Sequence, residues 1–421
     1  MKICFLSQSF YPYVGGVSDY LRDLGRELTR EGTEVHEVTF KTEDTSVYED
    51  FEGIKVHRFL RDRSTELLTG YGRFKENILK ATHRQKVKKD VLARREGYGF
   101  KRYMRVNERA RKKLLSLHKE EEFDIIHIQD FQFLPMGRLL EGNVDVPVVF
   151  TWHIPFIPEI PEEWKEFFVR YMDDYQRCIF STNEYLETAV NAGLPKKKCL
   201  RIYPFVDLRR YRPEDRAGDF KKKYGLEGTR IILCVSRLDP RKGQSTLINA
   251  LPNVIKEFPD TKAVFVGNGS MTKEMIGGRS TALQRLKTLA NRKGVRDHVL
   301  FTGYVSEEDL NGAFEASDVT VQPSIMEAFG LTVAQAMSFR KPVIGTNVGG
   351  IKVQILNEKT GFLFEPGDYN FLSVLLLFLL KNRKIAEKMG EEGEKRIEKM
   401  ADVKVGLKAH MKLYDRLTGR E

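Results

Sequence analysis

The chain alternates short apolar runs with amphipathic helical stretches, and it does so in two series. The first series opens with Ile3–Leu6 and the second with Ile231–Ser236. This alternation is typical of α/β architecture with parallel sheets, because a parallel strand needs a crossover helix before the next strand. No such pattern crosses Tyr203–Tyr224, a charged stretch that contains proline. We therefore predict two Rossmann-like domains of similar size.

The expected strands set the bounds of these domains. The first series predicts strands at Ile3–Leu6, Val35–Phe40, Ile54–Phe59, Ile125–Ile128, Val148–Thr151 and Cys178–Ser181. The second predicts strands at Ile231–Ser236, Ala263–Val266, Val299–Thr302, Val319–Gln322 and Val343–Gly345. The first domain is predicted to cover residues 1–205 and the second residues 206–385. Residues 386–421 are predicted to form a charged helical tail.

The positive charge of the chain lies in one segment. The 421 residues carry a formal net charge of +11, which alone would suggest a nucleic-acid or anionic-membrane partner. Residues 61–120, however, hold nineteen Lys/Arg and seven Asp/Glu, a balance of +12, so the rest of the chain sums to −1. The strand pattern disappears in this basic segment. Its second half predicts a helix docked by one face, with apolar residues at helical spacing, namely Phe100, Tyr103, Ala110, Leu114 and Leu117.

Cysteine usage and hydropathy exclude some classes of protein. The four cysteines show no paired C-x-x-C spacing, which favours buried or free thiols in a reducing compartment. The apolar N-terminal run is too short for a secretory signal. The longest apolar run, near Val374–Leu380, is far below the ~20 residues of a membrane span. We expect a cytoplasmic protein whose membrane contact, if any, is peripheral.

The strongest chemical motif is the segment Pro323–Thr332, which follows an expected strand and precedes an expected helix. Gly330 permits a tight turn, and the N–H groups of Phe329, Gly330 and Leu331 face outward at the helix N-terminus. Such N–H groups, together with the helix dipole, favour a phosphate. The Glu327 carboxylate is better suited to accept hydrogen bonds from sugar hydroxyls; the alternative is that it caps the helix.

A second motif, Ser236–Gly243, also follows an expected strand. Arg237 ends that strand, and Lys242 lies five residues further on, before the next helix. Two cations at a strand end could clamp a diphosphate whose charge grows as it leaves. The alternative is a solvated basic turn.

Together these motifs resemble the GT-B glycosyltransferases of family 4, a retaining group that includes sucrose and trehalose synthases and bacterial glycolipid transferases. Glu327-Ala-Phe-Gly-Leu resembles the first half of the family's E-x7-E motif, and Gly15-Gly16 its N-terminal glycine loop. Arg237 and Lys242 resemble its diphosphate-binding pair, and Val343–Gly350 the segment that closes the donor pocket. The resemblance covers essentially the whole chain in the right order.

Within the group, several segments are most similar to the archaeal trehalose glycosyltransferring synthases. They are Gly349–Ile355, Ser236–Pro240, Tyr203–Asp207, Trp152–Ile154 and Glu163-Trp164. The first ~120 residues lack this similarity, so the acceptor side is expected to differ. The second glutamate of the E-x7-E motif is replaced by Gln335. The family binds the nucleotide ribose there, so donor affinity or nucleotide preference is expected to change.

The resemblance also implies roles for other residues. His153 matches a family histidine that lines the donor sugar, although a lone histidine is more often structural. Gly267 matches a turn beside the nucleotide; a dinucleotide fingerprint at Gly267–Gly269 is disfavoured, because Thr272 stands where the third glycine belongs. His127 and Asp130, which follow a strand, fit functional and structural roles equally, and Asp207 fits an interdomain structural role. No metal-ligand spacing is present, so we expect no metal.

The resemblance implies a GT-B fold, with two domains facing each other across a cleft and the tail packing back on the N-terminal domain. It implies a retaining hexosyltransferase with a nucleotide-sugar donor in the C-terminal domain, an acceptor in the N-terminal domain, and no further cofactor. Lys242, Arg237 and the helix N-terminus would stabilise the leaving diphosphate, Glu327 would hold the donor sugar, and Gln335 the ribose. Donor binding would also involve Gly15, Gly16, Gly267, Phe329, Gly330 and Leu331.

Three hypotheses for the basic segment remain. It covers the acceptor in a disaccharide synthase of the trehalose type, whose acceptor is a sugar or sugar phosphate. Alternatively, it holds the enzyme on an anionic membrane, where a lipid-linked acceptor reaches the cleft. Finally, the chain could be a nucleic-acid-binding protein that lost activity through Gln335; the few, scattered aromatic residues of the segment disfavour this.

Overall fold

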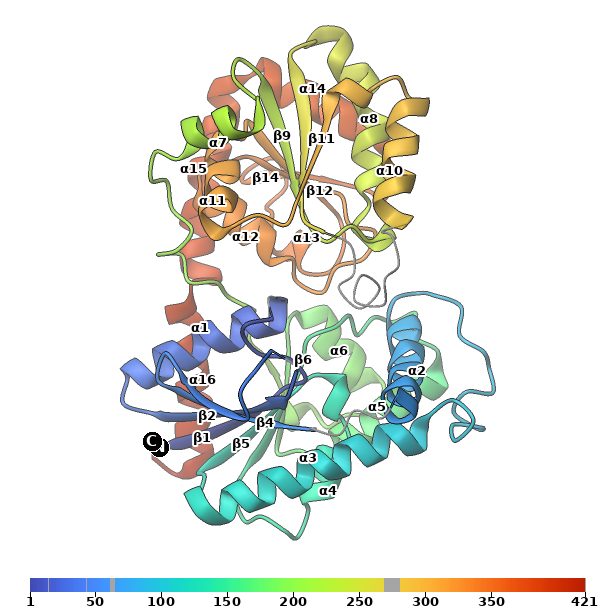
Figure 1. Cartoon of the computed structure of the whole chain (residues 1–421), viewed down its shortest axis with the longest axis vertical. Coiled ribbons are helices and arrows are strands. Elements are labelled where there is room, and N and C mark those ends of the chain that lie inside the picture. Colours follow the sequence, from blue (N-terminus) through green and yellow to red (C-terminus); the bar gives the residue numbers. More distant parts are fainter. Residues whose placement is uncertain (14, 43, 61–64, 269–280, 421) are drawn as a thin grey trace. The chain divides into compact units, whose positions relative to one another are not determined.

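The computed structural model describes residues 1–13, 15–42, 44–60, 65–268 and 281–420 (Figure 1). These residues form two compact units. The first unit comprises Met1–Pro204 together with Val403–Glu421, and the second comprises Phe205–Asp402. Each unit is a parallel sheet covered by helices on both faces, as the alternating sequence pattern predicts.

The described part of the first unit contains an eight-stranded sheet in the order β3-β4-β2-β1-β5-β6-β7-β8. Its pairs are parallel, apart from the antiparallel pair of β3 and β4. Leu6, Ile126 and Phe150 are fully buried, as expected for strands covered on both faces. The strands are β1 (Lys2–Leu6), β2 (Glu34–Phe40), β3 (Tyr48–Phe51), β4 (Ile54–Phe59), β5 (Ile125–Gln129), β6 (Val148–Trp152), β7 (Arg177–Phe180) and β8 (Cys199–Arg201).

Helices cover both faces of this sheet. On one face α1 (Gly16–Arg30) lies against α16 (Val403–Thr418), and on the other α3 (Phe100–Glu121) packs beside α2 (Thr65–Thr82) (Figure 1). Right-handed crossovers in opposite directions along the sheet account for this two-sided arrangement. The remaining helices are α4 (Met136–Leu140), α5 (Glu162–Met172) and α6 (Asn183–Asn191), with 3-10 turns η1 (Phe131–Phe133) and η2 (Lys196–Lys198).

The second unit contains, in its described part, a six-stranded parallel sheet in the order β11-β10-β9-β12-β13-β14. The strands are β9 (Arg230–Val235), β10 (Thr261–Val266), β11 (Val299–Gly303), β12 (Val319–Gln322), β13 (Val343–Thr346) and β14 (Gly361–Phe364). Burial of Ile232, Phe265 and Val321 against helix residues such as Leu247 and Leu376 builds its core.

Two helix layers enclose this second sheet. One contains α8 (Gln244–Glu257), α10 (Thr281–Arg292) and α14 (Tyr369–Lys381). The other contains two packed pairs, α7 (Ala217–Tyr224) with α11 (Glu307–Ala316) and α12 (Leu331–Ser338) with α15 (Arg383–Met400). Short elements connect them: η3 (Pro240–Lys242), η4 (Arg296–His298) and α13 (Ile351–Gln354).

The second half of the basic segment forms a helix docked by one face, as predicted; in its described part, α2 precedes this helix and the two are joined by the loop at residues 83–99. α3 buries Phe100, Tyr103, Ala110, Leu114 and Leu117, the residues whose spacing predicted one docked face. All four cysteines are free and buried, in agreement with the absence of paired spacing. No helix within the described residue ranges is long and apolar enough to span a bilayer.

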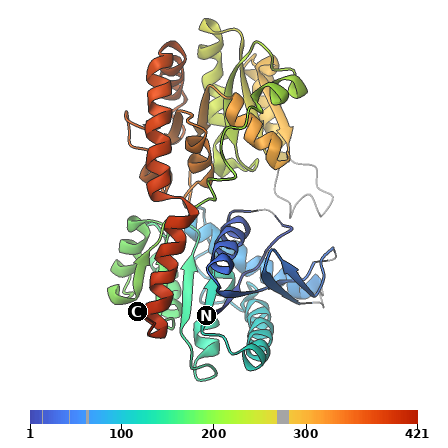
Figure 2. The same cartoon turned by 90° about the vertical axis from the view of Figure 1, so that its left-hand side faces the viewer.

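The predicted tail at residues 386–421 is not one element. Figure 2 shows its two helices in red, α15 belonging to the second unit and α16 to the first. Gly390 explains where α15 belongs: a Cβ there would lie 1.8 Å from the Arg340 carbonyl oxygen, so the helix is pressed against the end of α12. Only residues from Val403 onward pack on the first unit, which corrects the prediction that the tail starts at residue 386.

The sequence pattern also missed elements. Helix α7 lies inside the stretch predicted to carry no helix, because Phe220 is its one fully buried side chain and a single apolar residue shows no periodicity. The antiparallel strand β3 was missed because its burial alternates between exposed and half-buried, without a buried face. Strands β8 and β14 are only three and four residues long.

Candidate functional site

The motif loops of the second unit follow two neighbouring strands, β9 and β12. The chain leaves β9 toward β10 on one side and leaves β12 toward β13 on the other. The sheet order therefore reverses between them, and in open α/β sheets ligands bind outside the carboxyl ends of strands at such a switch point. We call the loops Ser236–Gly243 and Pro323–Gly330 together the β9/β12 loops.

Close backbone contacts fix the β9/β12 loops to each other. Gly243 has φ +66°, and a Cβ there would lie 1.9 Å from the Pro323 carbonyl oxygen, so only glycine fits. The Arg241 carbonyl accepts a hydrogen bond from the Ile325 backbone N–H at 2.8 Å. Residues far apart in sequence are thus held in one arrangement.

Lys242 and Glu327 meet across these loops. The Lys242 ammonium donates to Glu327 Oε2 at 2.6 Å, and the two side chains are only 20% and 11% exposed. Ser324 Oγ and Gln322 Nε2 donate to the same oxygen at 3.1 and 3.4 Å. Burial alone would raise the pKa of Glu327, but the Lys242 ammonium and these hydrogen bonds hold the pKa below its ordinary value. Glu327 is therefore ionised.

The N-terminus of α12 lies next to this ion pair. Gly330 is its N-cap, with φ +82°, and as a glycine it has no side chain that could cap the helix. The first N–H groups of a helix have no intrahelical partner and favour an anion. Gln354 holds the turn by donating to the carbonyls of Phe329 and Gly330 at 2.6 and 3.2 Å. Phe329 is buried, and Leu331 begins the helix.

The predicted cations near β9 differ in their surroundings. Arg237 is exposed and, within the part of the chain that the structure describes, forms no ion pair. Arg241 instead binds Asp239, which caps η3 and receives the Arg241 backbone N–H at 2.9 Å. Burial raises the pKa of Asp239, but hydrogen bonds from Arg241 outweigh it and set the pKa to about 2. The motif is therefore not a fully solvated basic turn.

The other predicted donor residues of this unit lie nearby in the fold. Gly267 follows β10 with φ +131°, and a Cβ there would lie 2.3 Å from the Ser236 carbonyl oxygen, so the glycine serves close packing beside the β9/β12 loops. Gln335 is half-buried on α12, and its side chain forms no hydrogen bond to any described residue. Gly269 and Thr272 lie outside the described residues.

Gly15 and Gly16 open α1 in the first unit, after β1. A Cβ at either position would meet no heavy atom within 4 Å, and Gly15 has an extended backbone with φ 175°. Neither packing nor backbone conformation requires glycine here, unlike at Gly243. The helix start is capped by no side-chain hydrogen bond.

His153 follows β6, and its environment keeps it neutral. Burial, with His410 nearby, lowers its pKa to about 3. Its Nε2 lies 2.9 Å from Gln129 Oε1, and the Gln129 amide nitrogen points instead to the His127 carbonyl, so Nε2 is the protonated nitrogen. Nδ1 then remains an acceptor without a hydrogen bond among the described residues.

Sequence reasoning missed a lysine beside this histidine. Lys75, on α2 of the basic segment, is half-buried and donates to Gln8 Oε1, which also accepts from Tyr71 Oη at 3.0 Å. Its ammonium lies 4.9 Å from the centre of the Tyr71 ring. Burial lowers the pKa of Lys75 to about 8, although the nearby Asp130 carboxylate acts to raise that pKa. One sequence feature could have revealed this lysine: Lys75 lies on the helix face that buries Phe74 and Ile78.

Asp130 joins these groups. Its Oδ1 accepts the His153 backbone N–H at 3.1 Å, and burial raises its pKa to about 7. Gln8, Asp130 and His153 therefore follow β1, β5 and β6, and Lys75 reaches them from α2. The strand order reverses between β1 and β5, so this polar cluster (Gln8, Lys75, Asp130 and His153) marks the switch point of the first unit.

Comparison with known proteins identifies the chain. The family described as glycosyl transferases group 1 matches residues 217–396, and glycosyltransferase family 4 matches residues 14–210. The trehalose synthase of Thermococcus litoralis is 31% identical over 307 residues, covering 70% of this chain and 72% of that protein. The chain belongs to glycosyltransferase family 4.

Solved structures agree with the fold of this glycosyltransferase. Sucrose-phosphate synthase from Thermosynechococcus elongatus matches with a TM-score of 0.78 at 20% identity, over 100% of both chains. Anabaena HepE, solved in complex with UDP-glucose, matches with a TM-score of 0.76 at 19% identity, over 99% of this chain and 100% of that one. The fold is GT-B, as the motifs implied.

Two other predicted residues of the glycosyltransferase have structural contacts. His127 uses both ring nitrogens inside the protein, binding Tyr414 Oη and Thr151 Oγ1, each at 2.7 Å. This favours its structural interpretation. The Asp207 carboxylate binds the Arg209 backbone N–H at 3.1 Å and the guanidinium at 2.7 and 2.8 Å, which fixes the local turn.

Buried histidines attach α16 to the first unit of the glycosyltransferase. His410 Nδ1 lies 2.7 Å from the Gly406 carbonyl, so this nitrogen donates and Nε2 accepts from Tyr20 Oη at 2.8 Å. Burial lowers the pKa of His410 to about 4 and that of His127 well below its ordinary value. The contact therefore depends on neutral imidazoles.

One group of side chains has the composition of a metal site. Ligand atoms of Glu34, His36 and Glu121 lie within 4.8 Å of one another. However, Lys55 binds Glu34 at 2.5 Å, and Lys2 lies 3.5 Å from Glu121. Two ammonium groups already balance both carboxylates, so an ion-pair network accounts for the group.

Proposed function

We propose that this glycosyltransferase moves a hexose, with retention of configuration, from a nucleotide sugar to a sugar or sugar phosphate. A relative named trehalose synthase supports disaccharide synthesis, and HepE in complex with UDP-glucose and a sucrose-phosphate synthase share the fold. Family membership favours this enzyme over a nucleic-acid-binding protein that lost its activity.

The Lys242–Glu327 pair beneath the α12 N-terminus carries the proposal. Breaking the bond between sugar C1 and the phosphate oxygen leaves its electron pair on the diphosphate. Lys242, the exposed Arg237 and the N–H groups of Gly330 and Leu331 supply positive charge where this negative charge grows. Since Lys242 uses one N–H on Glu327, two remain for phosphate oxygens.

The ionised Glu327 carboxylate is the proposed contact for the donor sugar. The Lys242, Ser324 and Gln322 bonds converge on Oε2. In the proposal, the ionised carboxylate accepts sugar hydroxyls, and Gln335 binds the ribose with one donor and one acceptor. The leaving phosphate takes the acceptor proton from the same face of the sugar, which retains the configuration without a covalent intermediate.

The polar cluster of the first unit provides the acceptor side. Gln8, Lys75 and Asp130 offer donors and acceptors of little net charge, which suits sugar hydroxyls better than an isolated phosphate. His153 Nδ1 can accept from a hydroxyl of the donor sugar. The open space at Gly15 and Gly16 allows a ligand to approach the α1 N-terminus closely.

A donor screen tests the proposal. ADP-, UDP- and GDP-glucose are each incubated with glucose or glucose 6-phosphate, without added metal, and the product anomer is assigned by proton NMR. The α-linked donor is expected to give an α-linked disaccharide. A β-linked product, or donor hydrolysis without transfer to either acceptor, would contradict the proposal.

The membrane hypothesis has a separate test. The basic segment could adsorb to anionic lipid at roughly 1 kcal/mol per basic residue near the surface. Flotation with phosphatidylglycerol vesicles at low and high salt measures this. Salt-sensitive flotation, with transfer only to a lipid-linked acceptor, would replace the disaccharide proposal.

A further inference from the structure

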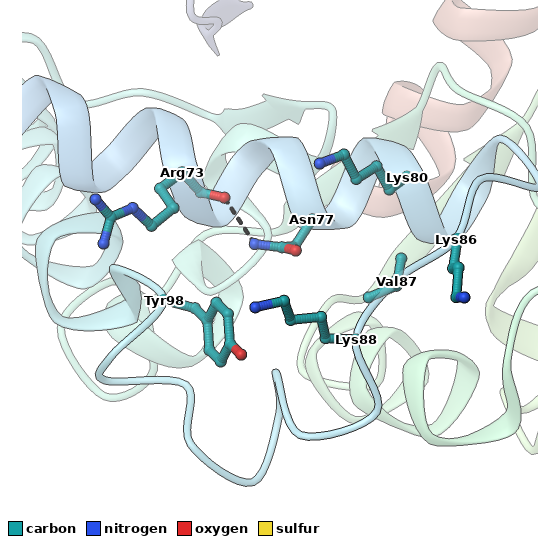
Figure 3. A pocket seen from close by; sticks show the side chains of 7 residues that line it. All are labelled: Arg73, Asn77, Lys80, Lys86, Val87, Lys88 and Tyr98. Carbon is teal, nitrogen blue, oxygen red and sulfur yellow. Dashed lines mark hydrogen bonds between the residues drawn. The ribbon is translucent and has the colours of Figure 1, made fainter.

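A cavity of about 480 Å³ lies between α2 and the following loop, outside the candidate site (Figure 3). Arg73, Asn77 and Lys80 line it from α2, and Lys86, Val87, Lys88 and Tyr98 line it from the loop at residues 83–99. We call it the α2 cavity. Its volume lies in the range of small-molecule sites, roughly 300–1,000 Å³.

The lining has one sign of charge. Four of its seven residues are cationic and none is acidic. Two acidic groups contact lining side chains from outside the lining: Glu76 lies 3.7 Å from Lys80 in an exposed pair, and Asp90 accepts a hydrogen bond from Tyr98 Oη at 2.9 Å. Lys86 and Lys88 form no ion pair with any residue in the described ranges. Their mutual repulsion is relieved when an anion binds.

The loop is held in place by close contacts. Gly99 has φ +92°, and a Cβ there would lie 2.1 Å from the Gly70 carbonyl oxygen, so the end of the loop touches α2 directly. The Lys88 ammonium lies 6.0 Å from the centre of the Tyr98 ring and, in Figure 3, points toward it. Asn77 Nδ2 donates to the Arg73 carbonyl at 2.9 Å, which orients its amide and leaves a second N–H for a ligand.

We propose that the α2 cavity binds a phosphate monoester. Lys80, Lys88 and the Asn77 amide supply donors for phosphate oxygens, with Arg73 and Lys86 on either side. The cavity is larger than one phosphate needs, so the ester group lies against the Tyr98 ring and Val87. The phosphate can belong to a free sugar phosphate or to a lipid headgroup.

This binding site is independent of the proposed transfer reaction. Lys75, on the same helix, contacts Gln8 and Tyr71, whereas Arg73, Asn77 and Lys80 line the cavity. Binding in the α2 cavity therefore needs neither the donor nor the Lys242–Glu327 pair.

Calorimetric titration of the full chain with glucose 6-phosphate and with inorganic phosphate tests the free source. Vesicles of phosphatidylcholine with 20% phosphatidic acid test the lipid source. The cavity variant is Lys80→Gln/Lys88→Gln, and Asn77→Asp places one negative charge there. The control is Lys101→Gln/Lys112→Gln, which removes the same charge from exposed positions on α3. Lys75→Met separates cavity binding from acceptor binding.

Affinity is expected to fall at least about tenfold in both cavity variants, because bonds to charged groups are lost, and to stay unchanged in the control. In Lys75→Met, affinity for inorganic phosphate and for the vesicles is expected to stay unchanged; glucose 6-phosphate is left out of this comparison because it is also a proposed acceptor. If the cavity variants weaken binding of the free phosphates and the control does not, the ligand is a soluble phosphate. If this difference is seen with the vesicles alone, the ligand is a lipid headgroup. Equal weakening in the control, loss only in Lys75→Met, or no saturable binding to any probe would overturn the proposal.

Discussion

The two switch points of the molecule use charge differently. At the β9/β12 loops the Lys242 ammonium lies against the Glu327 carboxylate and helps to hold its pKa below the ordinary value, so Glu327 is ionised. At the polar cluster of the first unit, burial works against charge: it lowers the pKa of Lys75 to about 8 and raises that of Asp130 to about 7. His153 is neutral there.

This difference suggests a division of labour for the proposed reaction. A leaving diphosphate needs fixed positive charge, and the second unit offers it. Sugar hydroxyls need donors and acceptors without a large field, and the first unit offers these. Substitutions at the β9/β12 loops should therefore change donor binding or turnover, and substitutions in the polar cluster should change acceptor binding.

The largest effect is expected at Lys242. Lys242→Met should lower kcat/KM by ~10²–10³, as does removing a donor to a developing oxyanion. Because that change also leaves Glu327 buried without its cation, the double variant Lys242→Met/Glu327→Gln is the control. It should regain thermal stability but not activity. Recovery of activity in steady-state assays of the double variant would reduce Lys242 to a counter-ion of Glu327.

At Lys75 the effect should fall on the acceptor. Lys75→Met removes a charged hydrogen-bond donor, so acceptor KM should rise about tenfold or more, with donor KM unchanged. Lys165→Met is the matched control, since Lys165 is another half-buried lysine of the first unit, paired with Glu162 on α5. An unchanged acceptor KM would remove Lys75 from the acceptor site.

A smaller effect is expected at Gln335. Gln335→Glu restores a carboxylate that can accept both ribose hydroxyls, so donor KM should fall by about fivefold to tenfold. Gln335→Ala should raise donor KM, and acceptor KM should stay constant in both. If neither variant changes donor KM, Gln335 does not contact the nucleotide.

The smallest effect concerns pH and stability. An unfolded histidine binds a proton near pH 6.5, whereas burial lowers the pKa of folded His410 to about 4, so its contribution to stability is lost as pH falls from 6.5 toward 4. Asp130 has the opposite sign, because its pKa is raised and its contribution is lost as pH rises through about 7. Because the two groups shift stability in opposite directions, the contribution of His410 has to be measured as a difference in unfolding free energy between wild type and variants.

Urea unfolding isolates the histidine term. The difference in unfolding free energy between wild type and His410→Gln should shrink by about 1.4 kcal/mol per pH unit below pH 6.5. Tyr20→Phe removes the same hydrogen bond but keeps the histidine, so its difference from wild type should stay nearly constant with pH. Parallel curves for both variants would refute a neutral His410.

Much of the fold could be predicted from sequence because strand–helix alternation is a local pattern. The ion pair of Glu327 with Lys242 could not be predicted, because the two residues lie 85 positions apart. Only the order of the sheet brings β9 and β12 together. The tail was predicted as one element because α15 and α16 share a charged helical pattern, and only their packing separates them.

Lys75 escaped prediction for a different reason. The apolar residues Phe74 and Ile78 indicate which face of the helix is buried. In a segment with a net charge of +12, however, the sequence does not distinguish Lys75 from lysines that lie in solvent. What distinguishes it is contact with Gln8 and Tyr71, and Gln8 comes from another element of the fold. Contacts between distant segments thus define the polar cluster.

Calorimetric titration with UDP-glucose, or with whichever donor the screen selects, tests the division of labour most directly. Binding is predicted to weaken at least tenfold in Lys242→Met/Glu327→Gln, because bonds to charged groups are lost, and to remain at the wild-type value in Lys75→Met. Equal weakening in both variants would contradict the account, since the two switch points would then bind the same substrate.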